Sequence, residues 1–167
     1  LTAGYGLDDP AAESYPALIR QKIEATPSPW RVVNAGLSGE TTSGGARRID
    51  WILRQPIAIF VLALGANDGL RGLSVPEMKK NLKEVIRLAK AAQLRILLVG
   101  MLMPPNYGKD YTDSYAKAFP EVAKDEGVPL VPFLLGGVAL SMIFDLNKSG
   151  AGSLYFADLL GASIGAV

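Results

Sequence analysis

The chain contains neither cysteine nor histidine among its 167 residues. Without cysteine, thiolate nucleophiles, cysteine-ligated zinc and disulfide bonds are excluded. Histidine is the commonest general base and metal ligand near neutral pH, so its absence removes the usual partner of a catalytic serine. We therefore expect no metal site and no cofactor.

A strong charge of either sign is also lacking. Seventeen basic side chains face sixteen acidic ones, and no run of Lys or Arg is long enough to follow a nucleic-acid backbone. Nucleic acid is therefore not an expected partner. The longest apolar run, residues 130–144, is too short and too interrupted by Pro and Gly to span a bilayer, so stable membrane insertion is not expected either.

Short apolar runs alternate with longer helical patterns along the chain, which predicts parallel strands joined by crossover helices. Continuous apolar runs are typical of strands that are covered on both faces. We thus predict a three-layer α/β/α fold with a parallel sheet. The predicted strands are "WRVVN" (30–34), "IAIFVLAL" (57–64), "LRILLVG" (94–100) and "VPLVPF" (128–133).

Four helices are predicted, one before the first of these strands and three between them. Residues 75–92 repeat apolar residues at spacings of three and four behind a plausible Ser74 cap. The other predicted helices are Pro16–Ala25, Thr42–Leu53 and Thr112–Glu126. The helix near Pro16 has no strand before it, so the sheet lacks its expected first strand.

Polar clusters follow two of the predicted strands, where ligands bind in open α/β sheets. "NAGLSGETT" (34–42) follows the strand predicted at 30–34, and "LGANDG" (64–69) follows the strand predicted at 57–64. Gly39 allows close backbone approach with an outward N–H, and Asn67 offers a side-chain amide donor. Together they could stabilise an anion, although Asn, Asp and Gly also make ordinary turns at strand ends.

These blocks resemble the SGNH (GDSL-type) hydrolases, in the branch of arylesterases, thioesterases and lysophospholipases. "LTAGYGLD" is similar to the residues after the family's nucleophile, "VVNAGLSGETTSGGARR" to its glycine block and "LGANDGLRG" to its asparagine block. "MPPNYGKDYTDSY", continuing to "FPEVAKDEGVPLVPF", is similar to a stretch of this branch, so the resemblance runs from Leu1 to about Asn147. It implies a single domain with a flavodoxin-like sheet and hydrolysis of a small acyl ester or thioester. A periplasmic or secreted location is suggested by this resemblance alone.

The resemblance also assigns roles to residues. It implies that the Gly39 backbone and the Asn67 side chain are two of three oxyanion donors. The third would be the nucleophilic serine, in a Gly-Asp-Ser-Leu turn whose Leu matches Leu1, so we expect the first strand and the serine to precede Leu1. The Asp-x-x-His turn expected after Asn147 is replaced by "KSGAGSLYFADLL". We therefore expect an ester hydrolase that is inactive or nearly so as given, or a catalytically dead ligand-binding scaffold.

Three further expectations concern the remaining residues. Leu70, Pro105 and Tyr107 should line an acyl pocket, because the loops that carry them face one crevice, although Tyr107 could instead pack the loop. Ser163 lies in "GASIG", which fits a nucleophile elbow or reflects chance Gly and Ser usage. The tail 148–167 could supply the missing strand, since "LYFADLLGASIG" is similar to the family's first strand and turn; a terminal helix is the alternative.

Overall fold

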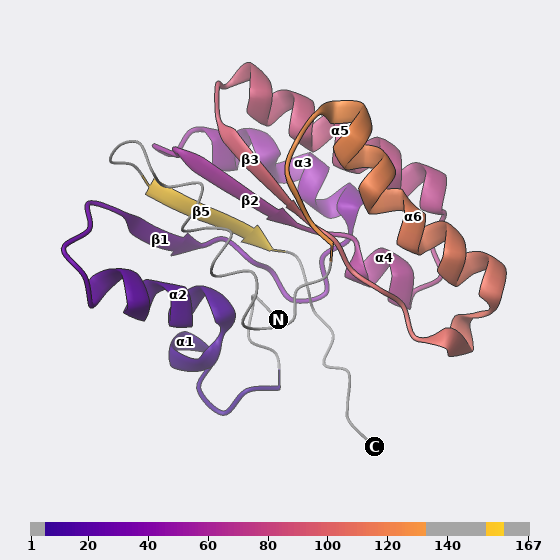
Figure 1. The fold of residues 1–167 in the computed structure, drawn as a ribbon, viewed down its shortest axis with the longest axis horizontal. Coiled ribbons are helices and arrows are strands. Elements are labelled where there is room, and N and C mark those ends of the chain that lie inside the picture. Colours follow the sequence, from indigo (N-terminus) through magenta and orange to yellow (C-terminus); the bar gives the residue numbers. More distant parts are fainter. Residues whose placement is uncertain (1–5, 133–152, 159–167) are drawn as a thin grey trace.

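The structure is a computed structural model that describes residues 6–132 and 153–158. Within these residues, five strands form one sheet in the order β1-β5-β2-β3-β4, and every pairing is parallel (Figure 1). The predicted parallel sheet is therefore confirmed. In this order, the strands are β1 (Arg31–Asn34), β5 (Ser153–Asp158), β2 (Ile59–Ala63), β3 (Arg95–Val99) and β4 (Leu130–Val131).

Helices cover both faces of the sheet. One apolar cluster packs α3, α5 and α6 against the strands, and a second cluster packs α2 against the opposite face (Figure 1). No helix in the described part of the chain is both long and apolar enough to cross a bilayer. The helices are α1 (Pro10–Glu13), α2 (Tyr15–Glu24), α3 (Thr42–Leu53), α4 (Ala66–Leu70), α5 (Val75–Ala91), η1 (Pro105–Tyr107) and α6 (Lys109–Glu126).

The central strand β2 shows why the sheet has three layers. Successive side chains of a strand point to opposite faces. Phe60 and Leu62 accordingly join the cluster under α3, α5 and α6, while Ile59 and Val61 join the cluster under α2. Every residue of β2 is buried, as expected for a parallel strand covered on both faces.

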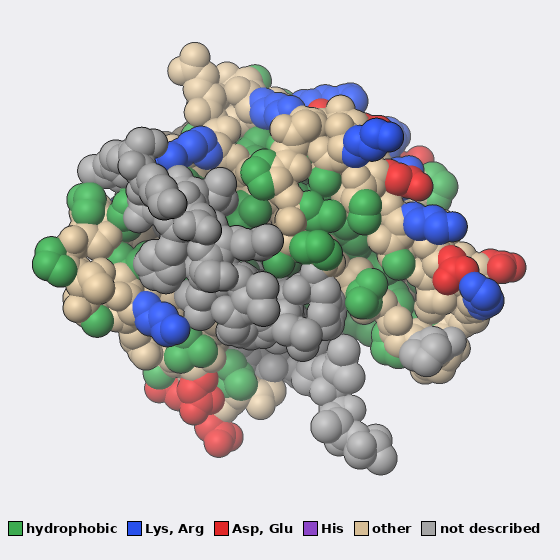
Figure 2. Space-filling view, viewed as in Figure 1, with side chains coloured by type: hydrophobic (Ala, Val, Ile, Leu, Met, Phe, Trp, Pro, Cys, Tyr) green, Lys and Arg blue, Asp and Glu red, His purple; other side chains and the backbone are tan. Residues whose placement is uncertain are grey.

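Helix α5 follows the signals in its sequence. The Ser74 side chain accepts a hydrogen bond from the Glu77 backbone N–H at 3.4 Å, which caps the first turn. Met78, Leu82 and Ile86, spaced four residues apart, form a buried stripe against the sheet. Figure 2 shows that Lys and Arg (blue) and Asp and Glu (red) alternate along α6, the helix beside α5.

The predicted elements agree with the structure except at specific ends. The predicted helices at 16–25, 42–53 and 75–92 match α2, α3 and α5 within one residue, and α6 begins at Lys109, before the predicted Thr112. The predicted strand at 128–133 is too long, because only Leu130–Val131 pair. Pro129 and Pro132 flank this pair, and proline has no N–H to donate to a sheet. The turn predicted after β2 continues into the short helix α4.

Strand β5 comes from the C-terminal part of the chain and lies inside the sheet. It pairs in parallel with β1 on one side and with β2 on the other, and Asp158 stands opposite Ala63. In a flavodoxin-like sheet with the order 2-1-3-4-5, this second position belongs to the first strand. That β5 replaces the family's first strand stays a prediction. The rest of the tail, residues 148–152 and 159–167, lies outside the described residues.

Candidate active site

The chain leaves the carboxyl end of β2 through Gly65. Its φ of +116° is a left-handed value that favours glycine. A Cβ at Gly65 would also lie 3.1 Å from Met78 Sδ and 3.2 Å from Phe119 Cζ, so the position is tight as well. This turn allows α4 to begin at once, and α4 carries Asn67 and Asp68, each only 4% exposed. Two polar side chains are thus buried at the carboxyl end of the central strand β2.

The loop after β1 meets α4 directly. Arg71 Nη2 donates a hydrogen bond to the Gly39 carbonyl oxygen at 2.8 Å, and Asn67 Nδ2 donates to the Glu40 carbonyl oxygen at 2.9 Å. Gly39 has φ +78°, so its backbone also takes a conformation that favours glycine. The structure therefore brings together the two residues predicted as donors: the Asn67 amide contacts the residue next to Gly39.

Arg48 on α3 holds this loop from within. Its Nε donates to both carboxylate oxygens of Glu40 at 2.9 Å, and its Nη2 donates to the Ala35 carbonyl oxygen at 2.7 Å. The side chains of Arg48 and Glu40 are 18% and 10% exposed, so water screens this ion pair less than one on the open surface. The loop from Ala35 to Glu40 is thus fixed at both ends by one guanidinium group.

A buried carboxylate joins α4 to the start of α3. Asp68 accepts hydrogen bonds from the Thr42 N–H at 2.8 Å and from Thr42 Oγ1 at 2.6 Å. Asn81 Nδ2 on α5 donates to the same Thr42 oxygen at 3.0 Å. Burial raises the pKa of Asp68, while the hydrogen bonds from Thr42 and the charge of Arg71 act in the opposite direction. This network sets the spacing between the loop that carries Gly39 and helix α4, which carries Asn67.

Three tyrosines brace the backbone around α4. The hydroxyl of Tyr107 donates to the Leu70 carbonyl at 3.2 Å, and that of Tyr111 donates to the Leu73 carbonyl at 2.9 Å. The hydroxyl of Tyr115 donates to the Gly65 carbonyl at 3.0 Å. Burial raises the pKa of Tyr115, so its phenol stays protonated and remains a donor.

The predicted substrate-binding residues come together only in part. Tyr107 contacts Leu70 through the hydrogen bond above, both side chains are half-buried, and Pro105 opens η1 two residues before Tyr107. That they line an acyl pocket stays a prediction, and the loop-packing role of Tyr107 has this hydrogen bond in its favour. Ser163 lies outside the described residues. Within the described ranges, no cluster of three or more Asp or Glu side chains could hold a metal ion.

Sequence reasoning missed the residues that connect the site. Arg71 lies within "LGANDGLRG", where no local pattern gives it a role, and Arg48 lies in the middle of a predicted helix. Asp68 and Thr42 are 26 positions apart, so no local pattern pairs them. A usable signal was the run of polar residues directly after a fully apolar strand, because a polar group placed there requires a buried partner.

The parallel sheet covered by helices on both faces is consistent with an SGNH-hydrolase fold, and similarity to known proteins shows the family. The chain belongs to the GDSL-like Lipase/Acylhydrolase family, whose profile matches residues 1–157. The crystal structure of AlinE4, an SGNH-hydrolase family esterase, is 38% identical with a TM-score of 0.75, over 90% of this chain and 80% of that one. The crystal structure of TesA gives 37% identity and a TM-score of 0.76, over 82% and 76%.

Curated relatives show the same family. Esterase TesA of Pseudomonas aeruginosa is 37% identical over 83% of this chain and 68% of its own length. Thioesterase 1/protease 1/lysophospholipase L1 of Escherichia coli K12 is 38% identical over 84% of this chain and 65% of its own length. The chain thus spans about two thirds of the length of these relatives. The relatives are hydrolases that act on ester bonds.

Proposed function

We propose that the Gly39 N–H and the Asn67 side chain form an oxyanion hole for a small acyl ester or thioester. The observation that carries this proposal is the pair of bonds that Asn67 and Arg71 make to the carbonyls of Glu40 and Gly39. The bond to Glu40 fixes the orientation of the Asn67 side-chain amide at the loop that carries Gly39. Donors held in advance where charge develops supply a large part of catalysis in acyl transfer.

The nucleophile and the base limit what these 167 residues can do. Acyl transfer needs an activated nucleophile and a group that takes its proton, and the sequence contains neither Cys nor His. Oxyanion donors and binding alone leave a residual acceleration on the order of a thousandfold over water in triad knockouts. This polypeptide should therefore hydrolyse activated aryl esters feebly and without an acyl-enzyme burst.

An ester assay tests both parts. Purified protein of confirmed mass is given an activated aryl ester and, separately, a fluorophosphonate probe. We expect slow turnover, no burst and no labelling. Asn67→Ala should lower the residual rate by about a hundredfold or to the uncatalysed level, since it removes one donor. Gln21→Ala, which changes an exposed amide on α2, should leave the rate unchanged.

Two results would contradict the proposal. Full turnover with stoichiometric labelling of Ser163 would contradict the expected feeble activity and would identify Ser163 in "GASIG" as the nucleophile. A residual rate that Asn67→Ala leaves unchanged would remove Asn67 from the oxyanion hole.

The alternative function is a ligand-binding scaffold of the same fold. Two observations favour it. The sequence contains neither Cys nor His, and the Asn67 amide is still held against the loop that carries Gly39. Such a scaffold should bind a medium-chain fatty acid, with the chain against Leu70, Pro105 and Tyr107. Tyr107→Ala should then weaken binding several-fold, while Leu18→Ala, at an exposed apolar residue on α2, should not. Equal affinities of the two variants for the fatty acid would count against this pocket.

A further inference from the structure

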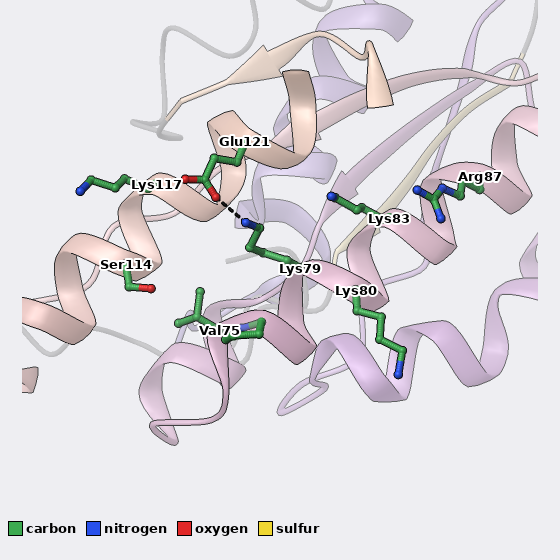
Figure 3. Close-up of a pocket in the computed structure, with 9 residues that line it drawn as sticks. Val75, Lys79, Lys80, Lys83, Arg87, Ser114, Lys117 and Glu121 are labelled. Atoms are coloured by element: carbon green, nitrogen blue, oxygen red, sulfur yellow. Dashed lines mark hydrogen bonds and ion pairs between the residues drawn. The ribbon is translucent and has the colours of Figure 1, made fainter. Parts of the chain in front are cut away.

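A cavity outside the candidate active site lies on the outer surface between α5 and α6. It has a volume of about 410 Å³, and none of its lining residues contributes to the network of Gly39, Asn67 and Asp68. Its nine lining residues include five cations and one carboxylate, Glu121 (Figure 3). The cations are Lys79, Lys80, Lys83 and Arg87 on α5 and Lys117 on α6.

Several of these cations already pair across the two helices. Lys79 pairs with Glu121, as the dashed line in Figure 3 shows, and Lys83 pairs with Asp125 at 2.6 Å. Arg87 Nη2 lies 2.8 Å from Glu126. One function of this row is therefore to hold α5 against α6. Lys79–Glu121 and Lys83–Asp125 are partly exposed, and exposed ion pairs are typically worth about 0–1 kcal/mol, so an external anion can compete for these two lysines at little cost.

Two of the cations are not used in holding the helices together. Lys117 extends from α6 in Figure 3, and its charge acts on Asp113 of the same helix, where it helps to lower the pKa of that carboxyl. Lys80 pairs only within α5, with Glu77 at 3.5 Å, and these two side chains are 70% and 64% exposed. The Ser114 hydroxyl on α6 adds a neutral hydrogen-bonding group to the lining of the cavity. Lys80 and Lys117 therefore line the cavity without taking part in the ion pairs that join α5 to α6.

We propose that this cavity binds a ligand that carries two or more phosphate groups. Lys79 and Arg87 are eight residues apart on one helix, which separates them by about 12 Å along its axis. This row is longer than a single phosphate group, and it suits charges that repeat along a ligand. Lysine binds phosphate as a point charge, and a helix can present several lysines to one chain of phosphates. Such phosphates can come from a soluble polyphosphate or from the headgroups of an anionic membrane.

Calorimetric titration with tripolyphosphate at low ionic strength tests the first source. We expect saturable binding that weakens as salt is added, because the attraction is electrostatic. The double variant Lys80→Gln/Lys117→Gln should raise the dissociation constant by about tenfold, since it removes two charges from the cavity. It spares all pairs between α5 and α6, and an unchanged melting temperature would verify that the fold is intact. The matched control Lys22→Gln/Arg54→Gln removes two exposed charges elsewhere and should bind like the parent.

Vesicles test the second source. Sedimentation with vesicles that contain an anionic phospholipid is compared with vesicles of a zwitterionic phospholipid alone. Binding of either tripolyphosphate or anionic vesicles that is lost in the cavity variant supports the proposal and identifies the source. The proposal is overturned if neither probe binds, or if the cavity variant and the control variant bind equally well. Neither experiment depends on ester hydrolysis. A negative result in both would therefore not bear on the proposed oxyanion hole.

Discussion

Replacing Asp68 by alanine should loosen the connection between α3 and α4. The change removes the acceptor of two hydrogen bonds from Thr42, a residue with no exposed surface, and leaves its N–H without that partner. Hydrogen bonds to a charged group contribute about 1.5–3 kcal/mol each. Because burial penalises the ionised carboxylate, we take the lower end of that range. The free energy of unfolding should therefore fall by about 3 kcal/mol.

Urea unfolding measures this loss. With a slope of about 1–3 kcal/mol per molar urea, the midpoint should fall by at least about 1 M at an unchanged slope. Asp50→Ala is the matched control, since Asp50 is an exposed carboxylate on α3, and surface changes usually stay within about 0.5 kcal/mol. If Asp68→Ala loses no more stability than Asp50→Ala, Asp68 does not join the two helices, and the account of how the donor loops are spaced is wrong.

Three further changes test neighbouring parts of the structure. Gly39→Ala should lower the free energy of unfolding in urea by about 1–2 kcal/mol, because an alanine is strained at φ +78°. No steric clash adds to this cost, since the atom nearest to the new Cβ, Arg71 Nη2, lies 3.5 Å away. A cost near zero would contradict the left-handed backbone at Gly39. Tyr115→Phe should cost about 1–2 kcal/mol in the same assay by leaving the buried Gly65 carbonyl without its donor, and no loss would mean that this bond is not formed. Because the pKa of Asp68 is raised in the folded state, the folded protein holds this proton more tightly than the unfolded chain does. The free energy of unfolding of the parent, measured relative to Asp68→Asn, should therefore fall as the pH rises above 3.8 and then level off. A rise over this interval would refute the raised pKa.

The sheet was predictable because its signals are local. The run at 57–64 is apolar at every position, and a strand buried on both faces requires this pattern. The cap at Ser74 and the apolar stripe behind it likewise fixed the start and the inner face of α5. These features depend on neighbours within a few residues, so they can be read without knowing the fold.

The candidate site was predictable only in part, because its contacts are long-range. Gly39 and Asn67 could be chosen from their places after two strands and from the family resemblance. Nothing local showed that Arg71 would reach the Gly39 carbonyl from 32 positions away. The strand at β4 was predicted, but its length was overestimated, since flanking prolines limit pairing without changing the apolar pattern.

Nuclear magnetic resonance of the ¹⁵N-labelled protein tests the central claim most directly. Octanoate is the ligand, and a carboxylate oxygen stands in for the oxyanion of the acyl intermediate. We predict that the Gly39 backbone amide and the Asn67 side-chain amide shift together and give one shared dissociation constant, while the Gln21 side-chain amide stays unchanged. If only one of the two donors responds, or if they respond with different dissociation constants, Gly39 and Asn67 do not bind the same oxygen.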